Sequence, residues 1–177
     1  MMKNENDKLF HSSPLLFTLK AWPVITIATI GLCFLTQFVA SLFGIELKEQ
    51  HNVEVMRRMF LHAFDNWKFF AVSVLNASLV VVILPALEEL VFRGPLRWLK
   101  KTPTQFTIAA LVLGAMFSGA HYFSQPWPDN AFIALFFFGL AQAWLYRKTD
   151  RLWCVMLNHS LFNLTNLVLL FFVPAPK

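Results

Sequence analysis

The chain has 177 residues, a length that favours a single domain. Hydrophobic residues make up 57% of it and charged residues only 14%, whereas soluble domains average about 45–50% and about 25%. This composition, with twenty phenylalanines and six tryptophans, excludes an ordinary soluble domain and favours a protein embedded in lipid. The net charge of +5 comes from short basic clusters between apolar runs, which argues against nucleic-acid binding and is typical of loops beside an anionic membrane surface.

The first 68 residues predict a tail, a membrane span and an interfacial helix. Residues 1–20 are polar and mixed in charge and predict a tail. Residues 21–45 carry no charge and are long enough to cross a hydrocarbon layer of about 30 Å as a helix. In residues 46–68 charges return, and apolar residues at spacings of three and four predict an amphipathic helix along the membrane interface. Its apolar face contains Val53, Met56, Met59, Phe60 and Ala63.

Residues 69–173 predict a core of four further spans. The second span begins near Phe69 and is expected to continue through Gly94 and Pro95 to about Leu99. The third covers residues 104–126 and ends in a turn at 125–128, where two prolines stop the helix. The fourth covers about 130–146, and the fifth covers about 152–173. We therefore predict an all-α, polytopic membrane helix bundle of about five transmembrane helices and one interfacial amphipathic helix.

The distribution of basic residues predicts the orientation of this bundle. One side of the membrane would hold ten Lys and Arg residues, and the other side five. The positive-inside rule then places the N-terminus and the loops with Lys100 and Lys148 in the cytoplasm, with Lys177 on the opposite side. We expect a multi-pass protein of a bacterial inner membrane or plasma membrane. Cys33 and Cys154 lie in apolar runs without a metal-ligand spacing, so we predict free thiols.

Three groups of polar residues fall within the predicted spans, where ionisable side chains cost about 2.5–3.5 kcal/mol each and are functional by default. In the first group, Glu89 and Arg93 are four residues apart, so they share a helix face and can form an ion pair. Glu88 points about 100° away from Glu89 and is left without a cation in its own segment. A carboxylate in this position suits a general base.

The other two groups supply imidazoles and an amide. His121 follows Gly114 and Ser118 at spacings of three and four, so it lies on a face of small residues that a neighbouring helix can approach closely. His159 and Asn163 are one helical turn apart, with Asn166 on the same stripe. Each group alone is more often structural, as an ion-pair clamp, a satisfied core histidine or a polar packing face. Together, two carboxylates, two imidazoles and an amide on three spans favour a catalytic site.

These motifs, in this order, resemble a known family. The sequence reads EELVFR at 88–93, FSGAH at 117–121 and HSLFN at 159–163. This is similar to the E-E-x-x-x-R, F-x-x-x-H and H-x-x-x-N set of the CAAX-processing and bacteriocin-processing intramembrane proteases, which are related to the CAAX prenyl proteases of the Rce type. The resemblance covers roughly residues 70–170 and implies a membrane-embedded peptidase. The prenyl-protein proteases have more spans than this chain, so the identity of the substrate stays open.

The resemblance implies that the catalytic residues are Glu88, Glu89, Arg93, His121, His159 and Asn163. We infer a glutamic-type endopeptidase in which Glu88, assisted by Glu89, activates a water molecule that His121 holds. His159 and Asn163 would donate hydrogen bonds to the oxyanion, and Arg93 would hold Glu89. No cofactor is expected. The partners would be the lipid bilayer and a protein or peptide substrate, including lipidated or membrane-anchored ones.

Two alternatives remain open at this stage. In the first, Glu88, His121 and His159 bind zinc, and the protein is an intramembrane metalloprotease. In the second, the protein is a non-catalytic immunity protein or a transporter that uses the same residues as a proton relay. For the peptidase we predict that the second helix extends beyond Arg93 and that Glu88, His121, His159 and Asn163 line one polar cavity. A separation above about 10 Å between Glu88 and both histidines would exclude a shared active site.

Overall fold

The computed structural model describes residues 13–48, 51–99, 102–123, 130–170 and 172, and this part of the chain is built of helices without a strand. The all-α prediction is therefore confirmed. The predicted turn at 125–128 lies outside the described residues, as do residues 1–12 of the predicted tail and the segment from 173 onward.

The first helix, α1 (Pro14–Leu42), begins earlier than the predicted first span. The side chain of Ser13 caps it by accepting a hydrogen bond from the Leu16 amide, and Pro14 occupies the first turn, where a missing amide hydrogen costs nothing. The prediction of a polar tail is therefore wrong for residues 14–20. These residues are helical because Ser13 and Pro14 form a helix start, which composition does not reveal.

Two helices follow α1 before the first of the three polar motifs. Helix α2 (His51–Leu61) lies within the stretch predicted for the interfacial helix, and its placement along the membrane surface stays a prediction. Helix α3 (Trp67–Ser78) begins after Asn66, whose side-chain oxygen accepts hydrogen bonds from the amides of Lys68 and Phe69. The hydroxyl of Ser73 donates to the Met59 carbonyl at 3.2 Å and ties α3 to α2.

The second span is one continuous helical segment, Trp67–Phe92, and we call it the rod. Its middle turn has a hydrogen-bond pattern different from that of an α-helix. After α3, residues Leu79–Ile83 form a π-helical turn (η2), and α4 (Leu84–Phe92) carries the first motif. The α-helix ends at Phe92, and Gly94–Arg97 form a short 3₁₀-helix (η3). The prediction that the second helix extends beyond Arg93 to about Leu99 is therefore wrong. Pro95 has no amide hydrogen to bond backwards and disfavours α conformation at Gly94.

Three further helices complete the bundle: α5 (Pro103–Phe123), α6 (Phe132–Thr149) and α7 (Leu152–Leu170). They coincide closely with the third, fourth and fifth predicted spans. Helix α6 ends at Asp150, which adopts a left-handed conformation with φ of 51° and lets the chain reverse directly into α7.

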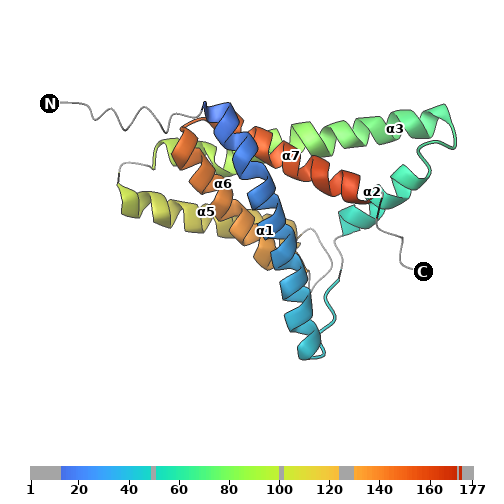
Figure 1. The fold of residues 1–177 in the computed structure, drawn as a ribbon, viewed down its shortest axis with the longest axis horizontal. Coiled ribbons are helices and arrows are strands. Elements are labelled where there is room, and N and C mark those ends of the chain that lie inside the picture. The colour runs from blue at the N-terminus through green and yellow to red at the C-terminus, as the bar shows by residue number, and fades with distance from the viewer. Residues whose placement is uncertain (1–12, 49–50, 100–101, 124–129, 171, 173–177) are drawn as a thin grey trace.

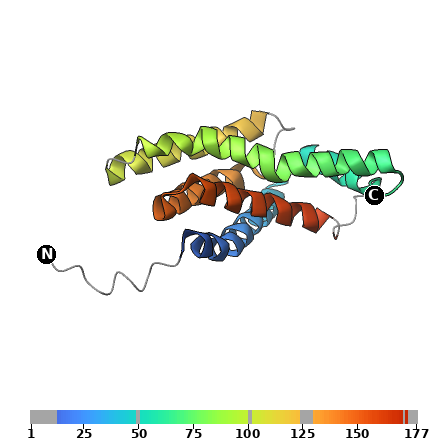
Figure 2. The same cartoon turned by 90° about the horizontal axis from the view of Figure 1, so that it is seen from above.

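The helices are arranged around α6 and α7. In Figure 1 α1 runs alongside α6 and α5 lies across α6, and α1 contacts both α6 and α7. Seen from above in Figure 2, α7 lies between the rod of the second span and α1. The C-terminal half of α1 extends beyond the other helices in Figure 1, and its large apolar side chains, such as Phe34 and Phe38, are exposed.

Four helices in the described part of the chain are long and apolar enough to cross a membrane: α1, the Trp67–Phe92 rod, α5 and α7. Large apolar side chains cover their outer surfaces, including Phe34 at 73% exposure and Phe123 at 87% exposure. These features are those of a multi-pass membrane protein. Helix α6, the fourth of the five predicted spans, is not among the four. It contacts α1, α5 and α7, and eight of its residues are buried, although Phe137 remains 52% exposed.

Candidate active site

Helix α4 presents its two adjacent glutamates to different surroundings. Glu89 is fully buried, whereas the side chain of Glu88 is 26% exposed. One carboxylate oxygen of Glu89 lies 3.2 Å from Nε of Arg93, so the ion pair predicted from the spacing of four is confirmed. Arg93 is itself buried, at the C-terminal end of α4, and its guanidinium carbon lies 4.5 Å from the centre of the Phe117 ring. The charge of Arg93 is therefore held by a carboxylate and an aromatic face.

The second oxygen of Glu89 contacts His159 on α7. The distance from this oxygen to Nδ1 of His159 is 2.7 Å, and both side chains are buried. This contact links α4 to α7, while the pair of Glu89 with Arg93 lies within α4 and its C-cap. With Nδ1 turned toward Glu89, the Nε2 atom of His159 is the nitrogen that faces Glu88.

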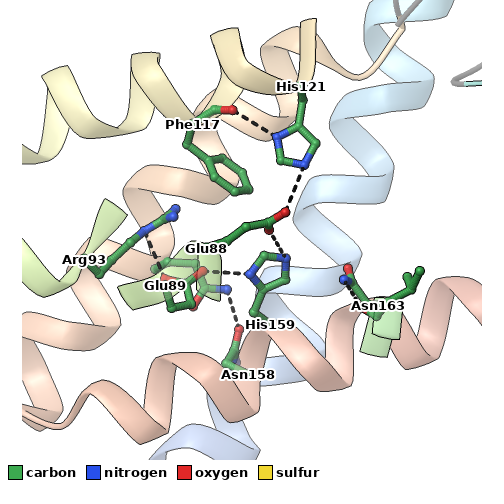
Figure 3. Close-up of polar contacts among 10 residues, drawn as sticks. Glu88, Glu89, Arg93, Phe117, His121, Asn158, His159 and Asn163 are labelled. Carbon is green, nitrogen blue, oxygen red and sulfur yellow. Dashed lines mark hydrogen bonds and ion pairs between the residues drawn. The ribbon is translucent and has the colours of Figure 1, made fainter. Parts of the chain in front are cut away.

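Glu88 lies between the two histidines, as Figure 3 shows. One of its carboxylate oxygens is 3.9 Å from Nε2 of His121, and the other is 3.6 Å from Nε2 of His159. Both distances are far below the limit of about 10 Å that we set for a shared site, so this part of the geometric prediction is confirmed. They are longer than a direct hydrogen bond, and a water molecule beside the three groups can contact each of them.

His121 is oriented by its own helix. Its Nδ1 atom lies 3.0 Å from the carbonyl oxygen of Phe117, one turn earlier in α5. A neutral ring that donates from Nδ1 to this carbonyl presents the lone pair of Nε2 toward Glu88. The two histidines therefore have different supports, since a carboxylate holds His159 and a backbone carbonyl holds His121.

Aromatic rings surround the charged groups. Phe117, which is fully buried, lies 4.6 Å from the His121 ring and 5.9 Å from the His159 ring, measured between centroids. Phe138 approaches the His159 ring at 5.0 Å. Phe117 belongs to a sequence motif for which no role was predicted. In the structure its ring contacts Arg93 and both imidazoles.

Sequence reasoning missed a second buried polar pair behind the site. Nε2 of Gln142 on α6 donates to Oδ1 of Asn158 on α7 at 2.9 Å, and both residues are fully buried. The only sequence signal is that Asn158 precedes His159, and Asn158 lies outside the predicted polar stripe of His159, Asn163 and Asn166. The pair fixes α6 against the turn of α7 that carries His159 (Figure 3).

Asn163 makes a different contact from the one predicted. Its side-chain nitrogen donates to the carbonyl oxygen of Val80 in η2 at 2.9 Å. One of its two amide hydrogens is therefore directed at the backbone of the second span, and the other remains for a further partner. The cavity predicted to contain Asn163 with Glu88 and the histidines stays a prediction.

The face of small residues on α5 packs closely against α6, as predicted. A Cβ atom at Gly139 on α6 would lie 3.1 Å from Cα of Gly114 and 3.2 Å from Nη2 of Arg93. The Ser118 hydroxyl donates to the Phe132 carbonyl at the start of α6. Gly139 is therefore the position at which α5, α6 and the Arg93 side chain meet.

Neither Cys33 nor Cys154 is in a disulfide, as predicted. Among the described residues, no group of three His, Cys, Asp or Glu side chains is arranged as a metal-binding set. The zinc alternative concerns Glu88, His121 and His159, and it is tested by experiment below.

Comparison with known proteins gives a family but no individual relative. No curated protein and no solved structure matches the chain significantly. The family described as type II CAAX prenyl endopeptidase Rce1-like matches residues 67–165, which is more than half of the chain. The matched segment begins at the first residue of α3 and includes Glu88, Glu89, Arg93, both histidines and Asn163. The chain therefore belongs to the Rce1-like family of type II CAAX prenyl endopeptidases, which are membrane proteases.

Proposed function

We propose that the protein is an intramembrane glutamic endopeptidase that hydrolyses a peptide bond of a membrane-associated protein or peptide. The observation that supports this most directly is the position of the Glu88 carboxylate, 3.9 Å from Nε2 of His121 and 3.6 Å from Nε2 of His159. A carboxylate and an imidazole that converge on one point can bind and deprotonate a water molecule there. Glu88 and His121 are also partly exposed, with side chains 26% and 23% accessible, so water can reach them.

In the proposed reaction, His121 accepts a hydrogen bond from the water through Nε2, and Glu88 takes a proton from it. The new hydroxide attacks the carbonyl carbon, and the electron pair of the C=O bond moves to oxygen. When this pair returns, the C–N bond breaks, and Glu88 gives its proton to the departing amine. The products are a carboxylic acid and an amine, and Glu88 returns to its starting form. Proton transfer from the acid to the amine then gives a carboxylate and an ammonium ion.

His159 and Asn163 would stabilise the negative oxygen of the intermediate. In this proposal His159 carries a proton on each nitrogen, with Nδ1–H bonded to Glu89 and Nε2–H directed to the oxyanion. Asn163 would contribute the amide hydrogen that Val80 does not use. Glu89 and Arg93 do not touch the substrate in this scheme. They hold His159 in position through the 2.7 Å and 3.2 Å contacts.

A second candidate mechanism is zinc-dependent hydrolysis. Nε2 of His121 and Nε2 of His159 both face the Glu88 carboxylate, and two histidines with one carboxylate are a ligand set of catalytic zinc. Zinc binding would require these three side chains to move, because they are not arranged as a metal-binding set in the structure. The experiments separate the two mechanisms. Membership of a protease family speaks against the non-catalytic immunity protein or transporter.

Substrate trapping tests the proposed function. Membranes carrying Glu88→Gln should retain peptides uncleaved that are shortened in membranes carrying the parent protein. Glu46→Gln is the matched control, because it makes the same chemical change at an exposed residue outside the site. If no peptide differs between the Glu88→Gln and parent membranes, the proposed activity is refuted.

A further inference from the structure

Pro85 interrupts the hydrogen-bond register of the second span three residues before Glu88. In η2 the amide of Leu84 donates to the carbonyl of Leu79, five residues earlier, as in a π-helix. The next donor in that register would belong to residue 85, and its acceptor would be the carbonyl of Val80. Proline has no amide hydrogen, so the register leaves this carbonyl without its backbone partner.

The partner comes instead from another helix. The side-chain nitrogen of Asn163 on α7 donates to the Val80 oxygen at 2.9 Å. Backbone carbonyls within a membrane have no water to bond, so a carbonyl released by proline requires a donor from its surroundings. Pro85 is fully buried, and both η2 and α4 pack against α7. The hydrogen bond from Asn163 on α7 therefore replaces the one that an amide hydrogen at residue 85 would have donated to the Val80 carbonyl.

This arrangement determines the direction in which Glu88 points. A π-helical turn contains more residues than an α-helical turn, and conversion of η2 to α-helix would rotate the following residues by about 100° relative to α3. Such a rotation would turn Glu88 away from His121 and His159. An amide hydrogen at residue 85 would compete with Asn163 for the Val80 carbonyl and release the contact that fixes the register.

We infer that Pro85 is a positioning residue: by lacking an amide hydrogen it keeps the Val80 carbonyl open to Asn163, which docks η2 on α7 and directs Glu88 toward the two histidines. The structural part of this inference is independent of the reaction. Its consequence for catalysis rests on the proposed function.

The test compares two replacements of Pro85 that differ in the backbone atom at the position of the proline nitrogen. Pro85→Ala supplies an amide hydrogen, whereas replacement of Pro85 by lactic acid, the α-hydroxy analogue of alanine, supplies an ester oxygen and no hydrogen. Both remove the proline ring. Pro23→Ala is the control for loss of a proline, since Pro23 is exposed within α1.

The first readout is the side-chain amide signal of Asn163 in asparagine-labelled protein, assigned by its loss in Asn163→Asp. We expect this signal to be shifted and protected from solvent exchange in the parent, in the lactic acid variant and in Pro23→Ala. In Pro85→Ala it should lose both properties. An unchanged Asn163 signal in Pro85→Ala overturns the inference. If the alanine and lactic acid variants lose the signal or the fold equally, the ring rather than the missing hydrogen is responsible, and the inference is also wrong.

The second readout is cleavage of the peptides trapped by Glu88→Gln. Pro85→Ala should cleave them about tenfold more slowly than the lactic acid variant, the factor expected for one net hydrogen bond. Equal rates in the two variants would refute the effect on catalysis. If the parent protein cleaves nothing, the proposed function fails, while the Asn163 signal still decides the structural inference.

Discussion

Glu88 and Glu89 are adjacent in sequence but differ in what holds them. Glu89 is fully buried and bonded to both Arg93 and His159, whereas Glu88 is partly exposed and lies at longer distances from its two histidines. Removing one partner of a buried ion pair is strongly destabilising, because the other charge stays buried and unpaired. Removing a partly exposed carboxylate costs much less stability. Substitution of Glu89 should therefore mainly lower stability, whereas substitution of Glu88 should mainly lower catalysis.

Glu89→Gln should lower the free energy of unfolding by about 3–5 kcal/mol, because it leaves Arg93 buried without a counter-charge. Glu88→Gln should lower it by less than about 1 kcal/mol. Unfolding of both variants in mixed detergent micelles measures the difference. Equal stability of the two variants would contradict the role of Glu89 as the buried link between Arg93 and His159.

Metal dependence is the next property of these side chains that experiment can settle. Cleavage in detergent should survive exhaustive chelation, because Glu88 and His121 activate water without a metal in the proposed mechanism. The measurement is the rate on a trapped peptide before and after chelation, with the zinc content of the protein determined in parallel. Loss of activity that returns only with added zinc would assign His121 and His159 as ligands instead.

Most of the candidate site could be predicted from sequence, because its residues are ionisable groups within apolar spans and such groups are rarely placed there without a role. Spacing alone predicted the pairing of Glu89 with Arg93. The contact between Glu89 and His159 and the pair of Gln142 with Asn158 could not be predicted, because each joins different helices. Their formation depends on how α4, α6 and α7 are packed.

At the level of the helices, the site depends on the close approach of α5 to α6. Gly114 and Gly139 meet at this crossing, and Arg93 reaches the same point from the end of α4. A side chain at Gly139 would displace either the α5 backbone or the guanidinium.

Gly139→Ala should destabilise the protein by about 1–3 kcal/mol, the usual cost of overpacking a close contact. It should also reduce cleavage, since Arg93 holds Glu89 and Glu89 holds His159. Gly31→Ala is the matched control: it lies in α1 with no atom within 4 Å of the added carbon, and it should be neutral or slightly stabilising. Thermal unfolding in detergent compares the two variants. Equal melting temperatures would show that the α5–α6 crossing tolerates a methyl group.

Helix boundaries could be predicted where a single residue determines them. The prediction failed where several sequence signals compete. The span starting at residue 21 was predicted from charge, yet α1 begins at Pro14 because Ser13 and Pro14 form a helix start. The second span was expected to remain α-helical beyond Arg93, but Gly94 and Pro95 end it, and η2 appears in its middle. A π turn leaves little trace in hydropathy, since its residues are apolar like their neighbours.

Considered as a whole, the molecule has basic residues at one end of the bundle. Lys20 follows the start of α1, Arg97 lies in η3, and Lys148 and Arg151 flank the connection from α6 to α7. All four are exposed, and the antiparallel order of the helices brings these segments to the same end. The positive-inside rule predicts that this end faces the cytoplasm.

Cysteine labelling in intact cells tests this orientation. In a background of Cys33→Ser and Cys154→Ser, a membrane-impermeant thiol reagent should label Glu46→Cys and should leave Lys148→Cys unlabelled until the cells are opened. Both positions are exposed and lie at opposite ends of the bundle. Labelling of Lys148→Cys from outside would reverse the predicted topology, while the internal site would be unaffected.

The central claim is that Glu88 acts as the base that activates water for peptide hydrolysis. Its most direct test is the cleavage rate of a trapped peptide by purified Glu88→Gln protein in lipid nanodiscs, compared with the parent and with Glu46→Gln. The account predicts that Glu88→Gln is slower by about 10²–10⁴-fold, the contribution of a general base, while Glu46→Gln cleaves at the parent rate. Cleavage by folded Glu88→Gln at a rate close to that of the parent would contradict the claim.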